Sequence, residues 1–160
     1  MKRKQLFEKF ITQNLDNIYR FAYIYVHNRQ DAEDIVNDSV IKALKSIHSL
    51  KNEEFMKTWF FRIITNTAYT YIKRRKKLVL MNDEVLENCD SSFDDYSHIS
   101  FEEMIQKLPL SYRSIIVLRF FEDLKISEIA EVLDINENTI KTRLYKALEI
   151  LKSDMEGDLR

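Results

Sequence analysis

The sequence predicts an all-α protein. Its 160 residues contain a single glycine, Gly157, and a single proline, Pro109, whereas 45% of the residues are apolar. Because tight β-turns depend on Gly, Pro and Asn at defined positions, a chain so poor in Gly and Pro has little room for hairpins. Apolar residues also recur three and four positions apart along most of the chain, which is the period of an amphipathic helix.

Charge divides the chain into three parts, although the net charge is only −1. Residues 1–81 contain 16 Lys and Arg against 8 Asp and Glu, residues 82–106 contain 8 acidic residues and no Lys or Arg, and residues 107–160 contain 9 against 10. This pattern predicts two modules around a charged connector. We expect the connector over 78–100, where helical periodicity is lost. It is either an inert tether or an electrostatic cover for the basic surface.

The front part is expected to form three helices, of which the first two cover residues 4–27 and 31–49. The first has an aromatic-rich apolar face that we assign to the core. Asp31 is the expected N-cap of the second. Acidic residues in a first turn commonly complement the helix dipole, but here they extend further and would suit docking to a basic protein surface. The residues in this cluster are Asp31, Glu33, Asp34, Asn37 and Asp38.

The third helix, over residues 55–77, interleaves aromatic, basic and amide side chains. Unstacked bases require a flat surface for stacking, cations for phosphates and an amide to read a base edge. Trp59, Arg62 and Asn66 provide these groups. The helix ends in five consecutive cations, which form either a solvated helix end or a phosphate-binding surface. They are Lys73, Arg74, Arg75, Lys76 and Lys77.

The rear part has the pattern of a helix-turn-helix. A short helix over 101–107 and a helix capped by Ser111 are expected to support two apolar stripes, separated by a turn at residues 134–137. Asp134 stands where glycine is common and tolerates the left-handed conformation less well, so the turn should form with some strain. Asn136 or Asn138 caps the last helix. Residues 152–160 should fray.

The second helix of this motif has a polar face opposite its leucine stripe. Lys and Arg reach phosphates or guanine edges, and Thr and Tyr add hydrogen bonds and apolar contacts, so the face suits DNA. The competing interpretation is an ordinary solvated face. The residues concerned are Thr139, Lys141, Thr142, Arg143, Tyr145 and Lys146.

Enzyme chemistry is not expected. The histidines His27, His48 and His98 are scattered, and neither a Gly-rich phosphate loop nor metal-ligand spacing is present in the sequence, so we expect no cofactor, metal or small-molecule substrate. No run of 18 uncharged apolar residues predicts a membrane span, and the charged N-terminus does not resemble a signal peptide. Cys89 cannot form an internal disulfide, which agrees with a bystander thiol in a reducing cytoplasm.

Three stretches together resemble an extracytoplasmic-function (ECF) sigma factor of the sigma-70 family. They are DAEDIVNDSVIKAL, FMKTWFFRIITNTAYTYIKRRKK and LPLSYRSIIVLRFFEDLKISEIAEVLDINENTIKTRLYKAL. The resemblance implies a σ2-like domain over 1–77, an acidic linker over 78–100 and a σ4-like domain over 101–160. It further implies a protein that binds core RNA polymerase and directs initiation by reading −10 and −35 promoter elements.

The resemblance also implies roles for single residues. The acidic face over 31–38 would dock on the β′ coiled coil of the polymerase, and the β flap is a further expected contact. Asn66 with Ser49 and Leu50 would hold a flipped −10 base, while Trp59, Arg62 and the basic run separate and hold strands. Arg119 and the polar face of the last helix would read the −35 element. An anti-sigma factor, often anchored in a membrane, is the implied regulator.

The linker sets a physical condition on this function. Two promoter elements about two helical turns apart are separated by roughly 70 Å. A relaxed coil of 23 residues spans only about 27 Å, so polymerase must hold the domains apart. When released, the domains can fold together or be clamped by another protein. The alternative function is a stand-alone helix-turn-helix regulator, which binds duplex DNA without polymerase and needs no base-capturing helix.

Overall fold

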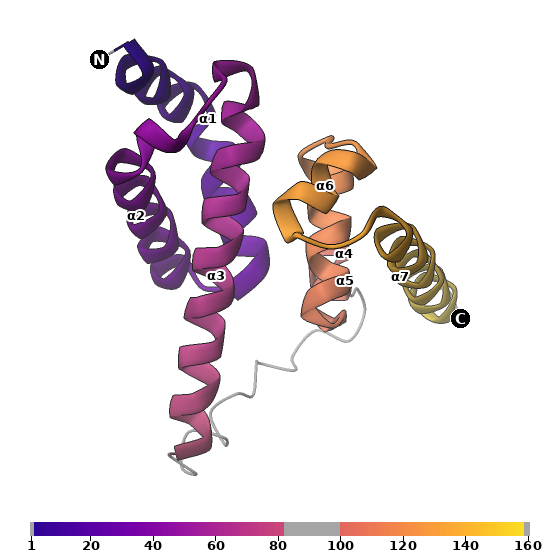
Figure 1. Ribbon diagram of the computed structural model, residues 1–160. Coiled ribbons are helices and arrows are strands. Elements are labelled where there is room, and N and C mark those ends of the chain that lie inside the picture. The colour runs from indigo at the N-terminus through magenta and orange to yellow at the C-terminus, as the bar shows by residue number, and fades with distance from the viewer. Residues whose placement is uncertain (1, 82–99, 159–160) are drawn as a thin grey trace.

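The computed structural model describes residues 2–81 and 100–158 (Figure 1). Within these ranges every regular element is helical, which confirms the all-α prediction. Most of the linker predicted over 78–100, namely residues 82–99 with Cys89 and His98, lies outside the described residues. The elements are α1 (Lys2–Val26), α2 (Arg29–Lys45), η1 (Ile47–Ser49), η2 (Glu53–Phe55), α3 (Met56–Met81), α4 (Phe101–Lys107), α5 (Leu110–Ile116), η4 (Val117–Phe121), α6 (Ile126–Leu133) and α7 (Glu137–Asp158).

Helices α1, α2 and α3 form the front module around an aromatic core, as the sequence predicted. Phe21 and Phe61 are 1% exposed, and their rings meet edge to face with centroids 4.9 Å apart. Phe7 packs on Phe60 with centroids 5.6 Å apart. Because edge-to-face pairs add to the energy of apolar burial, these contacts fix α1 against α3.

Several boundaries in the front module differ from the prediction. Asn28, and not Asp31, is the N-cap of α2, because the extended Asn28 backbone lets its side chain accept the backbone N–H of Asp31 at 2.9 Å. The helix ends at Lys45, and residues 47–49 form a separate 3-10 turn. Helix α3 continues to Met81, so residues 78–81 are helical and not part of a connector.

The rear module also departs from the prediction at its caps. Ser111 does not cap a helix: α5 begins at Leu110, and no side chain caps it, because Pro109 fixes the preceding backbone. The predicted helix 111–121 is instead α5 followed by the π-helical segment η4. The last helix does not fray at 152, since α7 continues to Asp158.

The turn of the helix-turn-helix forms as expected. Asp134 adopts the left-handed conformation, with φ 55° and ψ 50°, where glycine is usual. Of the two predicted caps of α7, Asn136 is the one observed, because its side chain accepts the backbone N–H of Asn138 at 2.7 Å. These two residues set the angle at which α7 leaves α6.

The two modules pack directly against each other, with α4, α5 and α6 alongside the front module (Figure 1). Arg113 of α5 donates to the backbone carbonyl of Tyr25 at 2.9 Å. Asn17 donates to the Glu122 carboxylate at 2.7 Å, and Lys57 donates to the Glu122 backbone carbonyl at 2.8 Å. These contacts describe a closed arrangement of the front and rear modules.

Candidate nucleic-acid interface

Helix α3 has three faces with different neighbours. Phe60, Ile64 and Ala68 are fully buried in the front core. A second flank meets the rear module: the Thr58 hydroxyl lies 3.5 Å from a Glu128 carboxylate oxygen, and the Tyr69 hydroxyl bonds to that of Ser114. Burial raises the pKa of Tyr69. The third face is exposed from Arg62 onward, although Trp59 is half-buried and Arg62 shares two cavities with residues of α6. It is the part of α3 that is available to a ligand.

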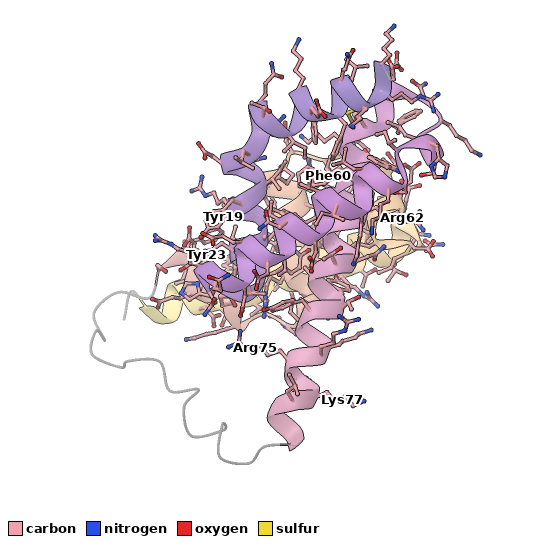
Figure 2. The ribbon with its side chains drawn as sticks, turned by 90° about the vertical axis from the view of Figure 1, so that its left-hand side faces the viewer. Tyr19, Tyr23, Phe60, Arg62, Arg75 and Lys77 are labelled. Atoms are coloured by element: carbon pink, nitrogen blue, oxygen red, sulfur yellow. The ribbon has the colours of Figure 1, made fainter. Side chains whose placement is uncertain are left out.

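The open face of α3 collects most of the predicted −10 residues. Positions 59, 62, 66, 70, 73 and 77 recur at helical spacing and therefore lie in one row along the helix. Asn66, Thr70, Lys73 and Lys77 are exposed, as is Arg62 (Figure 2). We call this row the open face; Thr70 is a member that the sequence analysis did not single out.

One cavity of about 230 Å³ lies at the N-terminal end of this face and is lined by Ser49, Leu50, Trp59 and Arg62. The Trp59 indole N–H donates to the Ser49 hydroxyl at 3.3 Å, which holds the 3-10 turn against α3. Leu50 is only 2% exposed and contributes to the cavity floor. The cavity also includes residues that sequence reasoning missed, namely Lys51, Asn52, Phe55, Thr58 and Glu131.

Of these missed cavity residues, Phe55 could have been identified from the sequence, whereas Glu131 could not. Phe55 is 58% exposed, and an aromatic residue beside Trp59 was a usable signal for a base-stacking surface. Glu131 belongs to α6 of the rear module, and nothing in the chain order places it beside residues 49–62. Its contribution follows from the packing of the two modules.

The predicted polymerase-docking cluster on α2 divides into two groups. Glu33, Asn37 and Asp38 are exposed. Asp31 is instead 7% exposed and faces α3, where its carboxylate accepts the Tyr71 hydroxyl at 2.7 Å. Asp34 is half-buried on this side of α2. Burial, together with the charges of Asp34 and Asp38, raises the pKa of Tyr71.

The basic run at the end of α3 is also divided. All five cations are exposed, but Arg75 also forms an ion pair with Asp31. Arg75 and Lys77 lie on opposite sides of the helix (Figure 2). Only Lys73 and Lys77 continue the open face, and Arg74 and Lys76 flank it.

On α7, the predicted −35 residues surround the solvent side of the helix. Lys141, Thr142, Tyr145 and Lys146 are exposed, Tyr145 by 68%. Thr139 and Arg143 are half-buried at the edge of this face. The opposite side buries Ile140, Ala147 and Leu151 in the rear core, so the sequence correctly separated the polar and apolar faces.

Arg119, the remaining predicted −35 residue, is not part of α7. It belongs to η4, is half-buried and donates to the backbone carbonyl of Leu124 at 3.2 Å. The structure therefore gives it a role in holding the loop that precedes α6.

In the closed arrangement, the start of α7 lies beside the open face of α3. Arg62, Asp134, Asn136 and Glu137 line a common cavity of about 530 Å³. The two predicted DNA surfaces thus adjoin each other, far closer than two promoter elements would be.

An apolar groove crosses the rear module on another side, and sequence reasoning did not identify it. It has a volume of about 460 Å³. Phe120 and Met155 are 56% and 49% exposed within it. An apolar cavity of this kind suits an apolar helix or loop of a partner. We call it the rear groove; it is lined by Phe101, Ile116, Phe120, Leu148, Leu151, Lys152, Met155 and Glu156.

Over 2–81 and 100–158 there is no helix with the length and apolar content needed to cross a membrane. The same part of the chain holds no cluster of His, Cys, Asp and Glu suited to a metal ion.

Comparisons with known proteins identify the family of both modules. Residues 10–78 match the family model "Sigma-70 region 2" and residues 98–151 match "Sigma-70, region 4". The chain is 43% identical to RNA polymerase sigma factor SigV of Bacillus subtilis over 157 residues, which cover 95% of each chain. It is 30% identical to ECF RNA polymerase sigma factor SigW of the same organism, over 88% of this chain and 83% of SigW.

Solved structures share the fold. The sigma factor RpoE in complex with the anti-sigma factor NepR, from Bartonella quintana, superposes with a TM-score of 0.79 at 23% identity, covering 94% of this chain and 96% of RpoE. CnrH in complex with the cytosolic domain of CnrY gives a TM-score of 0.70 at 19% identity, covering 95% and 88%. Two sigma-70 region matches in order, together with a close relative over nearly the full length, establish the family. The chain belongs to the ECF sigma factors of the sigma-70 family, which are transcription initiation factors and not enzymes.

Proposed function

We propose that the open face of α3 and the 230 Å³ cavity at its upstream end bind the −10 element, and that the polar face of α7 binds the −35 element. The observation that carries this assignment is the row from Trp59 through Asn66 to Lys77. This row has an aromatic ring, an amide and phosphate-binding cations in sequence along one helix face, which is exposed from Arg62 onward. The cavity is large enough for an unstacked base.

The same assignment requires the two modules to separate. Since the start of α7 shares a cavity with Arg62, the closed arrangement cannot contact promoter elements roughly 70 Å apart. Core RNA polymerase is the partner that would hold the modules open, with the exposed part of the α2 face, Glu33, Asn37 and Asp38, docking on the β′ coiled coil. The closed arrangement is then the free or inhibited state.

An anti-sigma factor is the proposed regulator. The RpoE and CnrH structures contain anti-sigma partners, and the fold likeness supports the same type of partner for this chain. We further propose that the partner is membrane-anchored, which follows from the resemblance to the ECF group. Co-purification from detergent-solubilised membranes against a soluble fraction tests the anchoring separately from the binding.

Reconstitution with polymerase tests the function directly. Purified protein mixed with core polymerase should form a stable assembly and yield transcripts from a specific promoter. Footprinting of duplex DNA by the protein alone, with no transcript on addition of core enzyme, would instead support the stand-alone regulator.

We expect the rear groove to bind the β flap of the polymerase. Leu148→Ser places a polar group in the groove, where Leu148 is 38% exposed, and should weaken core binding on the order of tenfold. The matched control is Leu15→Ser on α1, where the leucine is 50% exposed outside the groove. Equal core affinity for both variants in a titration with labelled core enzyme would exclude the groove as the docking site.

Lys146→Ala should weaken binding to the −35 element. Lys146 is exposed on the polar face of α7, and a good base-edge contact contributes about 1–3 kcal/mol of discrimination. Holoenzyme binding should be compared across promoters that differ only at single −35 positions. A loss of equal size on every sequence would show that Lys146 contacts only phosphate.

A further inference from the structure

The buried carboxylate of Asp31 is held by two side chains of one neighbouring helix. One carboxylate oxygen accepts the Tyr71 hydroxyl at 2.7 Å, and the other pairs with the Arg75 guanidinium. The Asp31 side chain is 10% exposed, against 58% for Arg75. Tyr71 and Arg75 are four residues apart, so both point from α3 toward the start of α2.

This geometry removes Arg75 from the DNA-facing row. Lys73 and Lys77 lie on the opposite side of α3 from Arg75, as Figure 2 shows for Lys77. If Arg75 moved to a phosphate, the Asp31 carboxylate, which is 10% exposed, would keep only the Tyr71 hydroxyl as a partner, and a nearly buried charge without its counter-charge is unfavourable. Arg75 is therefore better placed to anchor the helix than to bind DNA.

We propose that Asp31 is a positioning residue for DNA binding: through Arg75 and Tyr71 it fixes the distal half of α3, so that Lys73 and Lys77 stay in line with Asn66. This proposal rests on the assignment of the open face to the −10 element. It also links the helix that docks on polymerase to the helix that holds the strand, because Asp31 lies in the first turn of α2.

The proposal predicts that Asp31→Asn weakens DNA binding, which is the opposite of what the change in charge alone predicts. Removal of a negative charge beside a DNA surface should normally strengthen DNA binding. If Asp31 only competes with phosphate for Arg75, its neutralisation frees a cation and affinity rises. If Asp31 positions α3, affinity falls, because the remaining cations lose their alignment with the backbone.

The experiment measures binding of holoenzyme to a forked −10 probe as a function of salt. Each phosphate contact that is lost should reduce the slope of log K against log salt by about 0.7 on single-stranded DNA and about 0.9 on duplex. The variants are Asp31→Asn, Arg75→Ala and the double change Asp31→Asn with Arg75→Ala, and Lys77→Ala reports on a direct contact. Asp16→Asn is the matched control, since it makes the same chemical change at an exposed aspartate of α1.

We expect Asp31→Asn and Arg75→Ala each to lower affinity on the order of tenfold and to reduce the slope by about one contact. The double variant should be no weaker than either single one, because both act on one pair. Asp16→Asn should leave the slope unchanged. Unaltered slope and affinity in Asp31→Asn, with a lower melting temperature, would show a purely structural role and overturn the proposal, as would tighter binding.

The outcome for Lys77→Ala separates this proposal from the one on which it depends. A reduced slope for Lys77→Ala with an unchanged slope for Asp31→Asn refutes only the positioning role. No effect of Lys77→Ala would mean that the open face does not bind the −10 strand, and the proposed function of α3 would then be wrong.

Discussion

Asn66→Ala should impair promoter opening at the −10 element while leaving assembly with core polymerase intact. Asn66 is exposed in the middle of the open face, between the 230 Å³ cavity beside Trp59 and the cations at Lys73 and Lys77. An amide that makes two hydrogen bonds to a base edge contributes about 1–3 kcal/mol, so formation of open complexes should fall roughly 5- to 150-fold. Permanganate reactivity of unpaired thymines and a core-binding titration measure the two properties separately.

Gln13→Ala is the control for Asn66→Ala. Gln13 is an exposed amide on α1, away from the open face, so its truncation should change neither measurement. Loss of core binding in Asn66→Ala, with opening of the bound fraction unchanged, would show that Asn66 belongs to a polymerase contact and not to the −10 surface.

Glu122→Gln should remove a pH dependence of the closed arrangement. Glu122 is 2% exposed, and its second carboxylate oxygen has no hydrogen-bond partner among the described residues. Burial raises the pKa of Glu122 to about 7, while the Asn17 hydrogen bond and the Lys57 charge oppose this rise. The Glu122 carboxyl, which lies between the modules, is therefore more stable there in its protonated form.

The sign of the effect follows from the raised pKa. The closed arrangement binds a proton that open or unfolded chain releases, so its stability should fall as pH rises from the ordinary range of a glutamate, near 4.5, to about 7. Above about pH 7 both states are ionised and the dependence should level off. Glu122→Gln is neutral throughout, so it should be flat across this range and more stable than the parent at pH 8.

Urea unfolding between pH 5 and pH 8 measures this effect. The control is Glu149→Gln, an exposed carboxylate of α7 in the same module. An unchanged slope of stability against pH in Glu122→Gln would show that another group is responsible.

The sequence was sufficient for the helices and for the residues on each face of them. Periodicity predicted α3 and α7, and it placed Asn66 and Thr142 on polar faces, because helical spacing alone decides which side chains share a side. The predicted N-caps Asp31 and Ser111 were wrong. The N-cap residues are Asn28 for α2 and Pro109 for α5, because the start of each helix depends on the backbone conformation of a neighbouring residue.

What the sequence could not provide are the contacts between distant segments. Asp31 and Arg75 are 44 positions apart in the sequence. The sequence analysis assigned Asp31 to polymerase docking and Arg75 to DNA binding, so both were expected to face outward. Likewise, Glu131 beside the base-sized cavity and the rear groove depend on how modules and helices pack. These contacts follow from tertiary packing, which no local pattern encodes.

The distance between the two modules tests the central claim most directly. Spin labels at the exposed positions Gln13 on α1 and Ser153 on α7, in a Cys89→Ser background, would report the separation of front and rear modules. The free protein should give a single distance, that of the closed arrangement. On assembly with core polymerase and promoter DNA, the distance should lengthen by tens of ångströms, because the two promoter elements are roughly 70 Å apart. A transcribing complex in which the distance of the free protein persists would contradict the account.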